Sequence, residues 1–228
     1  MKKLAIILLF LAAAIMLPTS ALAAYDPEPV PDMNLSFDRQ TLREGLKVFT
    51  DICMGCHSAK FMTYQNLLDY GVFGLSREEV DVLRGERRLL SGLNTTLTPG
   101  MAKLYYGRVP PDLSLMARAR DDGGDYIAAL LTGYEHDPAR RIPDEAYNIY
   151  FPGHRIAMPD PLNWLGHKPE SEAKILEQAR SVASFLAFVA EPKQLTRKRI
   201  GYGVMAYLLI LVAVLRLLVR EDDKASEA

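Results

Sequence analysis

The sequence predicts a mainly helical domain with long loops, followed by one C-terminal transmembrane helix. Apolar residues recur at helical spacing in three stretches, near 38–52, 125–132 and 171–190, whereas strand patterns are sparse. An apolar run from Ile200 to Val219 is long enough as a helix, at about 1.5 Å per residue, to cross the hydrocarbon core of a bilayer. These two observations define the fold class.

The N-terminus has the pattern of a cleavable signal peptide. Lys2 and Lys3 precede 14 apolar residues, Leu4 to Leu17, and small residues follow at Ala21-Leu22-Ala23. An uncleaved anchor is the alternative, but the apolar run is short for a membrane span. We expect residues 1–23 to be removed and residues 24–196 to be exported.

The second apolar run predicts a single-pass anchor at 197–220 with a short internal tail at 221–228. Basic residues flank it on both sides, so the positive-inside rule alone does not choose an orientation. The signal peptide decides it, because it exports the long domain. Arg216 lies near the inner end, where its side chain can reach the interface.

The charge of the exported domain limits its partners. Without the two lysines of the signal peptide and the six basic and four acidic residues beyond position 196, it has 19 basic and 24 acidic residues. A net charge near −5 argues against nucleic acid as a partner and suits a basic protein. Solubility alone also accounts for such a charge.

The three helices differ in their signals. The first has a cap at Asp38 and should present residues 53–57 at its C-terminal end. The second runs from about Asp125 to Thr132, and the third from about Ser171 to Ala190, ending before a proline. Between the last two, residues 140–169 are rich in proline with little periodicity, which predicts a functional loop that wraps a ligand.

Both cysteines of the chain fall in one run, Cys53-Met54-Gly55-Cys56-His57, the attachment signature of c-type haem. On a helix, Cys53, Cys56 and His57 lie within an arc of roughly 100°, so two thiols and an imidazole reach one porphyrin from one side. A zinc site would need further Cys or His ligands, and a dithiol redox site would need a βαβ setting. Covalent haem matures outside the bacterial cytoplasm, which suits the predicted export to the periplasmic side of the inner membrane.

The character of the haem depends on its sixth ligand. Beside His57 as the first axial ligand, the candidates are the histidines and exported methionines outside the motif: His136, His154, His167, Met33, Met62, Met101, Met116 and Met158. Met158 is favoured, because Pro159 and Pro161 restrict the backbone around its thioether. A histidine ligand, or an open iron site with ligand-binding chemistry, remains an alternative.

Several motifs together resemble one family, cytochrome c1, the haem subunit of the cytochrome bc1 complex. They occur in the family's order: the haem motif, Pro110-Pro111-Asp112-Leu113-Ser114, Arg118-Ala119-Arg120, Asp125-Tyr126, Leu131-Thr132-Gly133-Tyr134, Tyr150-Phe151-Pro152-Gly153, Ile156-Ala157-Met158-Pro159 and Glu191-Pro192. The resemblance covers nearly the whole mature chain.

The resemblance implies a class I cytochrome c-like haem domain with one covalent haem c. It implies Met158 as the sixth ligand, Arg120 and Tyr126 at the haem propionates, and Pro110 and Pro111 along the haem edge. It further implies a one-electron carrier that accepts electrons from the Rieske iron–sulfur protein and passes them to a cytochrome c. Such a chain would join cytochrome b in a dimeric complex and would not be an enzyme on its own.

Two features depart from the family pattern. The segment from Gly166 to Glu170 looks shorter than in mitochondrial members, and Arg108 replaces a usual small residue. An alternative within the same chemistry is a membrane-anchored cytochrome c that donates directly to a terminal oxidase.

Overall fold

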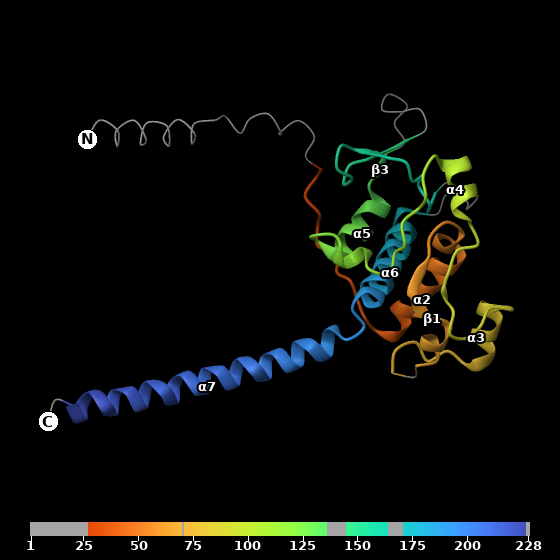
Figure 1. The fold of residues 1–228 in the computed structure, drawn as a ribbon. Coiled ribbons are helices and arrows are strands. Elements are labelled where there is room, and N and C mark those ends of the chain that lie inside the picture. The colour runs from red at the N-terminus through yellow and green to blue at the C-terminus, as the bar shows by residue number, and fades with distance from the viewer. Residues whose placement is uncertain (1–26, 70, 136–144, 164–170, 227–228) are drawn as a thin grey trace, which may run out of the picture.

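The computed structural model describes residues 27–69, 71–135, 145–163 and 171–226 (Figure 1). The predicted signal peptide lies outside these residues. The described chain is mainly helical, as predicted. Its α-helices are α2 (Arg39–Asp51), α3 (Arg77–Arg84), α4 (Pro99–Tyr106), α5 (Gly123–Thr132), α6 (Glu172–Ala190) and α7 (Gln194–Ser226).

The core forms where α6 packs against α2 on one side and α5 on the other. Phe49 of α2 and Phe185 of α6 are fully buried, with their ring centroids 5.4 Å apart. The helices approach closely at Gly45, where a Cβ atom would lie 2.0 Å from the carbonyl oxygen of Ser181. Glycine is therefore required here for the α2–α6 contact, which holds the haem motif against the core.

Helix α2 begins as predicted but ends before the haem motif. The Asp38 side chain accepts a hydrogen bond from the Thr41 amide and caps the helix. The motif continues as a 3-10 turn, η1 (Cys53–Gly55), in which the amides of Cys56 and His57 both donate to the carbonyl oxygen of Cys53. The helix thus presents the motif at its C-terminal end, as predicted, and the motif itself is a tighter turn that keeps the three side chains together.

Within the described residues, five short strands form two small antiparallel sheets. The first pairs β1 (Ala59–Thr63) with β2 (Gly92–Leu93), and the second has the order β3 (Tyr134–Glu135), β4 (Ala146–Asn148) and β5 (Arg155–Ile156). β4 and β5 lie within the stretch predicted as loop. Strands of two or three residues are too short for a recognisable alternation, which explains the difference.

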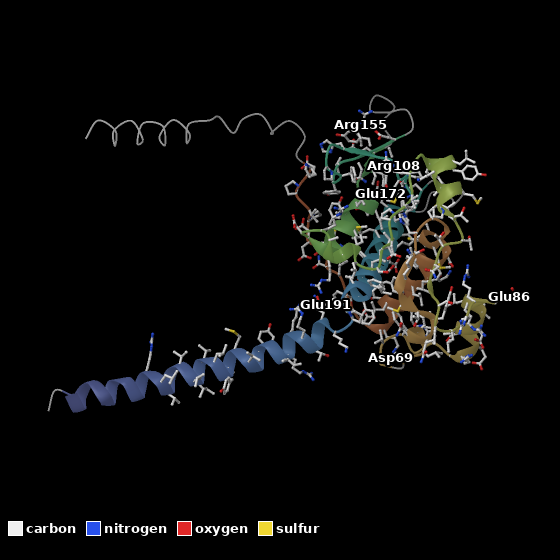
Figure 2. The ribbon with its side chains drawn as sticks, viewed as in Figure 1. Asp69, Glu86, Arg108, Arg155, Glu172 and Glu191 are labelled. Atoms are coloured by element: carbon white, nitrogen blue, oxygen red, sulfur yellow. The ribbon has the colours of Figure 1, made fainter. Side chains whose placement is uncertain are left out.

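The anchor prediction is confirmed by α7, whose segment Thr196–Arg216 is long and apolar enough to cross a membrane and is not buried against the rest of the chain. The helix itself extends beyond the predicted anchor at both ends. Its first turns are tied to the domain by an ion pair between Arg197 and Glu191, which lies at the start of α7 in Figure 2. This pair holds the pKa of the Glu191 carboxyl below its usual value.

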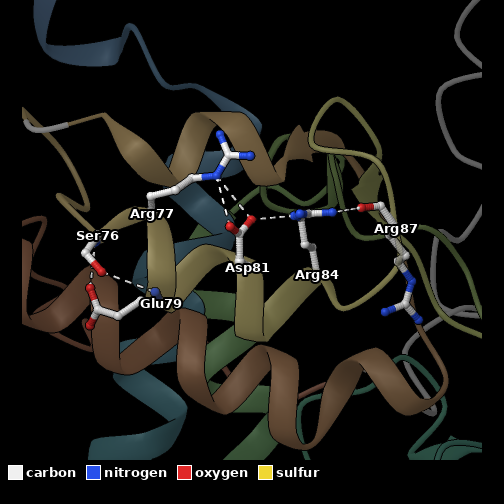
Figure 3. Close-up of polar contacts among 6 residues, drawn as sticks. All are labelled: Ser76, Arg77, Glu79, Asp81, Arg84 and Arg87. Carbon is white, nitrogen blue, oxygen red and sulfur yellow. Dashed lines mark hydrogen bonds and ion pairs between the residues drawn. The ribbon is translucent and has the colours of Figure 1, made fainter.

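Helix α3 was not predicted, although its capping signal is present in the sequence. Ser76 and Glu79 form a reciprocal capping box (Figure 3). Arg84 then donates to Asp81 at 2.6 Å and to the carbonyl oxygen of Arg87 at 2.7 Å, so it turns the following loop back onto the helix. Eight residues with Val80 as the one buried side chain give too weak a periodicity to predict.

Candidate haem site

One cavity collects all the residues that the sequence nominated for haem binding. It has a volume of about 300 Å³ and is lined largely by apolar side chains from α5, α6 and the loops around them. The nominated residues on its wall are Cys53, Cys56, His57, Pro110, Pro111, Arg120, Tyr126 and Met158. Segments far apart in the sequence therefore meet around one site.

His57 is oriented by the proline segment opposite it. Its Nδ1 atom lies 2.8 Å from the carbonyl oxygen of Pro111, and burial lowers the pKa of the ring. A neutral imidazole that donates from Nδ1 to a carbonyl keeps its lone pair on Nε2. The side chain is thus prepared as a ligand for a metal in the cavity.

The proline segment is itself held in place by backbone bonds to the residues after the haem motif. The Leu113 amide donates to the carbonyl oxygen of Ser58 at 2.7 Å. Asp112 accepts hydrogen bonds from the amides of Lys60 at 3.2 Å and Ser114 at 2.9 Å. These hydrogen bonds hold the Pro111 carbonyl in a fixed position relative to the haem motif.

Cys53 and Cys56 are unpaired and half-buried. Burial raises the pKa of the Cys53 thiol to about 12, so this side chain is a neutral thiol at physiological pH. A zinc ligand or a reactive dithiol would instead need a stabilised thiolate. Among the residues that the structure describes, no cluster of three His, Cys, Asp or Glu side chains suits a metal ion.

Met158 lies on the cavity wall in a loop fixed from both sides. The Tyr134 hydroxyl donates to the Met158 carbonyl oxygen at 3.2 Å. Two residues later Asp160, 4% exposed, accepts from the amides of Leu162 at 3.0 Å and Asn163 at 3.2 Å and from the Asn163 side chain at 2.8 Å. The loop therefore closes on itself through a buried carboxylate, which fixes the backbone that carries the thioether.

The structure narrows the other sixth-ligand candidates. Met33 and Met62 are buried in the core, and Met101 is exposed on α4. His154 is not on the cavity wall; its Nδ1 atom lies 3.3 Å from the carbonyl oxygen of Asn148. His136 and His167 lie outside the described residues.

One methionine besides Met158 reaches the cavity. Met116, in the 3-10 turn η3 (Met116–Arg118), also lines it. Two thioethers therefore share the cavity with His57. Of these, the Met158 thioether lies in the loop that the Asp160 carboxylate holds in place.

Arg120 and Tyr126 lie together at the cavity wall. The guanidinium carbon of Arg120 is 5.6 Å from the centroid of the Tyr126 ring, within the range of a cation–π contact. Burial raises the pKa of the Tyr126 hydroxyl, which stays a neutral donor. Arg118, two residues earlier, faces a second cavity instead.

The sequence did not nominate Tyr106 or Arg108 for haem binding, although Arg108 was noted as a departure from the family pattern. Both line the cavity from the end of α4 and the loop after it, and the Tyr106 hydroxyl lies 3.9 Å from the Cys56 sulfur. The sequence does contain a signal for the start of α4: Thr98 caps the helix and Pro99 occupies its first position, which is a common helix start.

Comparisons with known proteins identify the family. The family model described as Cytochrome C1 family matches residues 30–98 and 97–225. A cytochrome c1 of Blastochloris viridis is 31% identical over 224 residues, which covers 78% of each chain. A cytochrome c1 heme protein of Arabidopsis mitochondria is 33% identical over 199 residues, or 77% of this chain and 64% of the relative.

A longer relative has a composite name. The cytochrome b/c1 protein of Bradyrhizobium diazoefficiens is 30% identical over 221 residues, which cover 78% of this chain, and this chain spans only 32% of its length. The family model nevertheless matches most of this chain, from residue 30 to residue 225. The chain therefore belongs to the cytochrome C1 family.

Proposed function

We propose that this chain carries single electrons as the haem subunit of a quinol–cytochrome c reductase. One observation carries the proposal: His57, with its Nε2 lone pair free, shares an apolar cavity with two unpaired thiols and the Met158 thioether. A bound haem supplies a reversible one-electron iron couple. The residues around the cavity determine how firmly it is held and at what potential it works.

Four side chains on the cavity wall would hold the cofactor. Cys53 and Cys56 would bind it through thioether bonds, and His57 and Met158 would ligate the iron. Methionine ligation raises the reduction potential, as a carrier downstream of quinol needs. The apolar wall excludes water and so disfavours the additional charge of the oxidised state.

The polar residues of the site orient the cofactor. The fixed charge and planar fork of Arg120 suit a propionate carboxylate, and the Tyr126 hydroxyl adds a donor beside it. Pro110 and Pro111 line the cofactor edge with rigid apolar surface. No residue needs to act as a general acid or base, so quinol chemistry belongs to other subunits.

We infer that the electrons come from the Rieske iron–sulfur protein and leave to a cytochrome c, with cytochrome b as a neighbour in a dimeric complex. The relatives named cytochrome c1 and cytochrome b/c1 support this assignment. The signal-peptide pattern and α7 support a single-pass protein of the bacterial inner membrane, with residues 24–196 on the periplasmic side.

Gentle detergent purification followed by an optical redox titration tests the proposal. We expect one haem that stays attached after denaturation, reversible one-electron behaviour, and co-purification with cytochrome b and the Rieske protein. Isolation as a free carrier would favour direct donation to a terminal oxidase. Rapid carbon monoxide binding by the native reduced protein would contradict the carrier assignment, because it requires an open iron site.

A further inference from the structure

Met158 is tied to both outer strands of the small sheet that has the order β3, β4, β5. Strand β5 ends two residues before Met158, and its Ile156 pairs with Ala146 of β4 and lines the haem cavity. From β3, the Tyr134 hydroxyl donates to the Met158 carbonyl oxygen at 3.2 Å. The position of the thioether therefore depends on where this sheet lies.

Asn148 joins the sheet to α5. It is the last residue of the central strand β4 and is fully buried, at 0% exposure. Its Nδ2 atom donates to the carbonyl oxygen of Leu130 at 2.7 Å, and its Oδ1 atom accepts from the Tyr150 amide at 3.0 Å. Since a carbonyl only accepts and an amide N–H only donates, this orientation of the side chain satisfies both groups. One buried side chain thus holds the helix and the turn that follows the strand.

The Leu130 carbonyl needs such a donor. It belongs to the last turn of α5, where the final carbonyl oxygens have no amide of the same helix to accept from. Leu130 also lines the haem cavity, as do Leu131 and, near the start of the helix, Tyr126. Asn148 therefore satisfies a helix terminus and at the same time fixes the sheet to a helix that forms part of the cavity wall.

The sheet and α5 are in close contact where the helix ends. In Figure 1, β3 lies directly above α5. At Gly133 a Cβ atom would lie 2.4 Å from the Tyr150 ring and 3.1 Å from the Oδ1 atom of Asn148. The Gly133 carbonyl oxygen accepts from the Ile149 amide at 3.0 Å, and Tyr134 pairs with Asn148 in the ladder. The sheet therefore has little room to shift while Asn148 keeps its hydrogen bonds.

We propose that Asn148 is a positioning residue for the sixth ligand: it fixes β4 to α5, and the neighbouring strands carry that position to Met158. The inference rests on the function proposed above and concerns how firmly the thioether is held at the iron. Asn148 does not line the cavity, so it acts through Tyr134 and Ile156. Because the loop is ordered in advance, little conformational entropy is lost when the thioether binds.

The test measures how easily an added ligand displaces the Met158 thioether. Imidazole binds the oxidised iron where the methionine bond gives way, so its apparent affinity rises as that bond weakens. Asn148→Ala leaves the Leu130 carbonyl and the Tyr150 amide without their partner. In the purified complex we expect an apparent imidazole affinity about tenfold higher, which corresponds to about 1.4 kcal/mol and lies within the cost of an unpaired buried group. The reduction potential should fall.

Asn66→Ala is the matched control. The Asn66 Oδ1 atom accepts from the Thr63 amide at 2.9 Å and from its hydroxyl at 2.6 Å, in the cap of the 3-10 turn η2 (Tyr64–Leu68). This variant should lose stability but keep the wild-type imidazole affinity and reduction potential. A wild-type affinity in Asn148→Ala would overturn the proposal. Equal increases in the two variants would also overturn it, because they would reflect destabilisation alone.

Tyr134→Phe tests the other end of the same connection. It keeps the ring and removes the hydroxyl that donates to the Met158 carbonyl. The imidazole affinity should rise again, and the double variant with Asn148→Ala should show less than the product of the two single effects, because both act on one path. Effects that multiply would contradict this path. Should Asn148→Ala fail to assemble, an unchanged affinity in Tyr134→Phe would overturn the proposal.

Redox titration with small-molecule mediators separates this inference from the proposed function. A reversible one-electron couple in the wild type, with the imidazole affinity unchanged in the variants, overturns only the role of Asn148. Absence of a reversible couple, or a wild-type protein that binds imidazole as an open iron site does, overturns the proposed function and with it the inference.

Discussion

The Nδ1 atom of His57 lies 2.8 Å from the carbonyl oxygen of Pro111, 54 positions later in the chain. The contact links the haem motif to the segment that forms the cavity edge. It fixes the tautomer and the plane of the imidazole, because a protonated Nδ1 leaves the lone pair on Nε2. Because the acceptor is a backbone carbonyl, the orientation of the His57 imidazole depends on the position of the segment around Pro111 rather than on another side chain.

Replacement of the sixth ligand should be specific to one methionine. Met158→Leu should abolish the absorption band of the methionine–iron bond, lower the reduction potential and open the reduced iron to carbon monoxide. Met116→Leu is the matched control, because it removes the other thioether on the cavity wall. Loss of the band in Met116→Leu, with the band intact in Met158→Leu, would assign the ligand to η3.

The Asp160 carboxylate should hold the ligand loop. Asp160→Ala removes the acceptor for three donors, and a buried donor left without a partner costs about 1–3 kcal/mol. We expect a fall in the free energy of unfolding and weaker methionine ligation in the optical spectrum. Asp160→Asn keeps an acceptor for the amides and should recover most of the ligation. If the alanine variant retained native ligation, the loop would be held by other contacts.

Arg120 should raise the reduction potential more than its neighbour Arg118 does. Its guanidinium charge lies on the cavity wall, where it disfavours the extra positive charge of the oxidised cofactor. Redox titration should therefore give a lower potential for Arg120→Gln than for Arg118→Gln, since Arg118 faces the other cavity. Equal shifts in the two variants would mean that Arg120 acts only as part of the general surface charge.

The Cys53 thiol should resist alkylation in the folded chain before haem attachment. Because burial raises its pKa to about 12, the neutral form stabilises the fold below the ordinary thiol pKa, and this contribution is lost as the pH rises toward 12. In the Cys56→Ser variant, the rate of iodoacetamide labelling should stay low at pH 8 and rise only in strong alkali. Labelling with a midpoint near that of free cysteine would show that Cys53 is solvated.

The cap of the helix that leads to the haem motif should be sensitive to acid. Hydrogen bonds from Ser36 and Thr41 hold the pKa of the Asp38 carboxyl well below its usual value. A lowered pKa stabilises the fold at pH values above the unfolded pKa, and this contribution is lost as the pH falls. Asp38→Asn should therefore melt below the wild type at neutral pH, and the difference should begin to narrow as the pH falls below about 4, the usual pKa of an aspartate. A gap that widened in acid would contradict this assignment.

The sequence by itself determined the features that depend on local spacing or composition. The haem motif is a five-residue pattern, so the ability of Cys53, Cys56 and His57 to face one ligand follows from any helical turn, whether α or 3-10. The anchor follows from the composition of one continuous run. The capped start of α2 and the long periodic α6 were likewise predicted from residues close together in the chain.

The tertiary structure decided whatever depends on contacts between distant segments. The hydrogen bond from His57 to Pro111, the meeting of Met158 and Met116 at one cavity, and the short strands β4 and β5 depend on backbone bonds that no local pattern encodes. It also decided where the charges lie. Net charge is a sum over residues and carries no positions, whereas the fold places Arg108 and Arg120 on the wall of the haem cavity and Arg118 with five acidic residues on the wall of the second cavity.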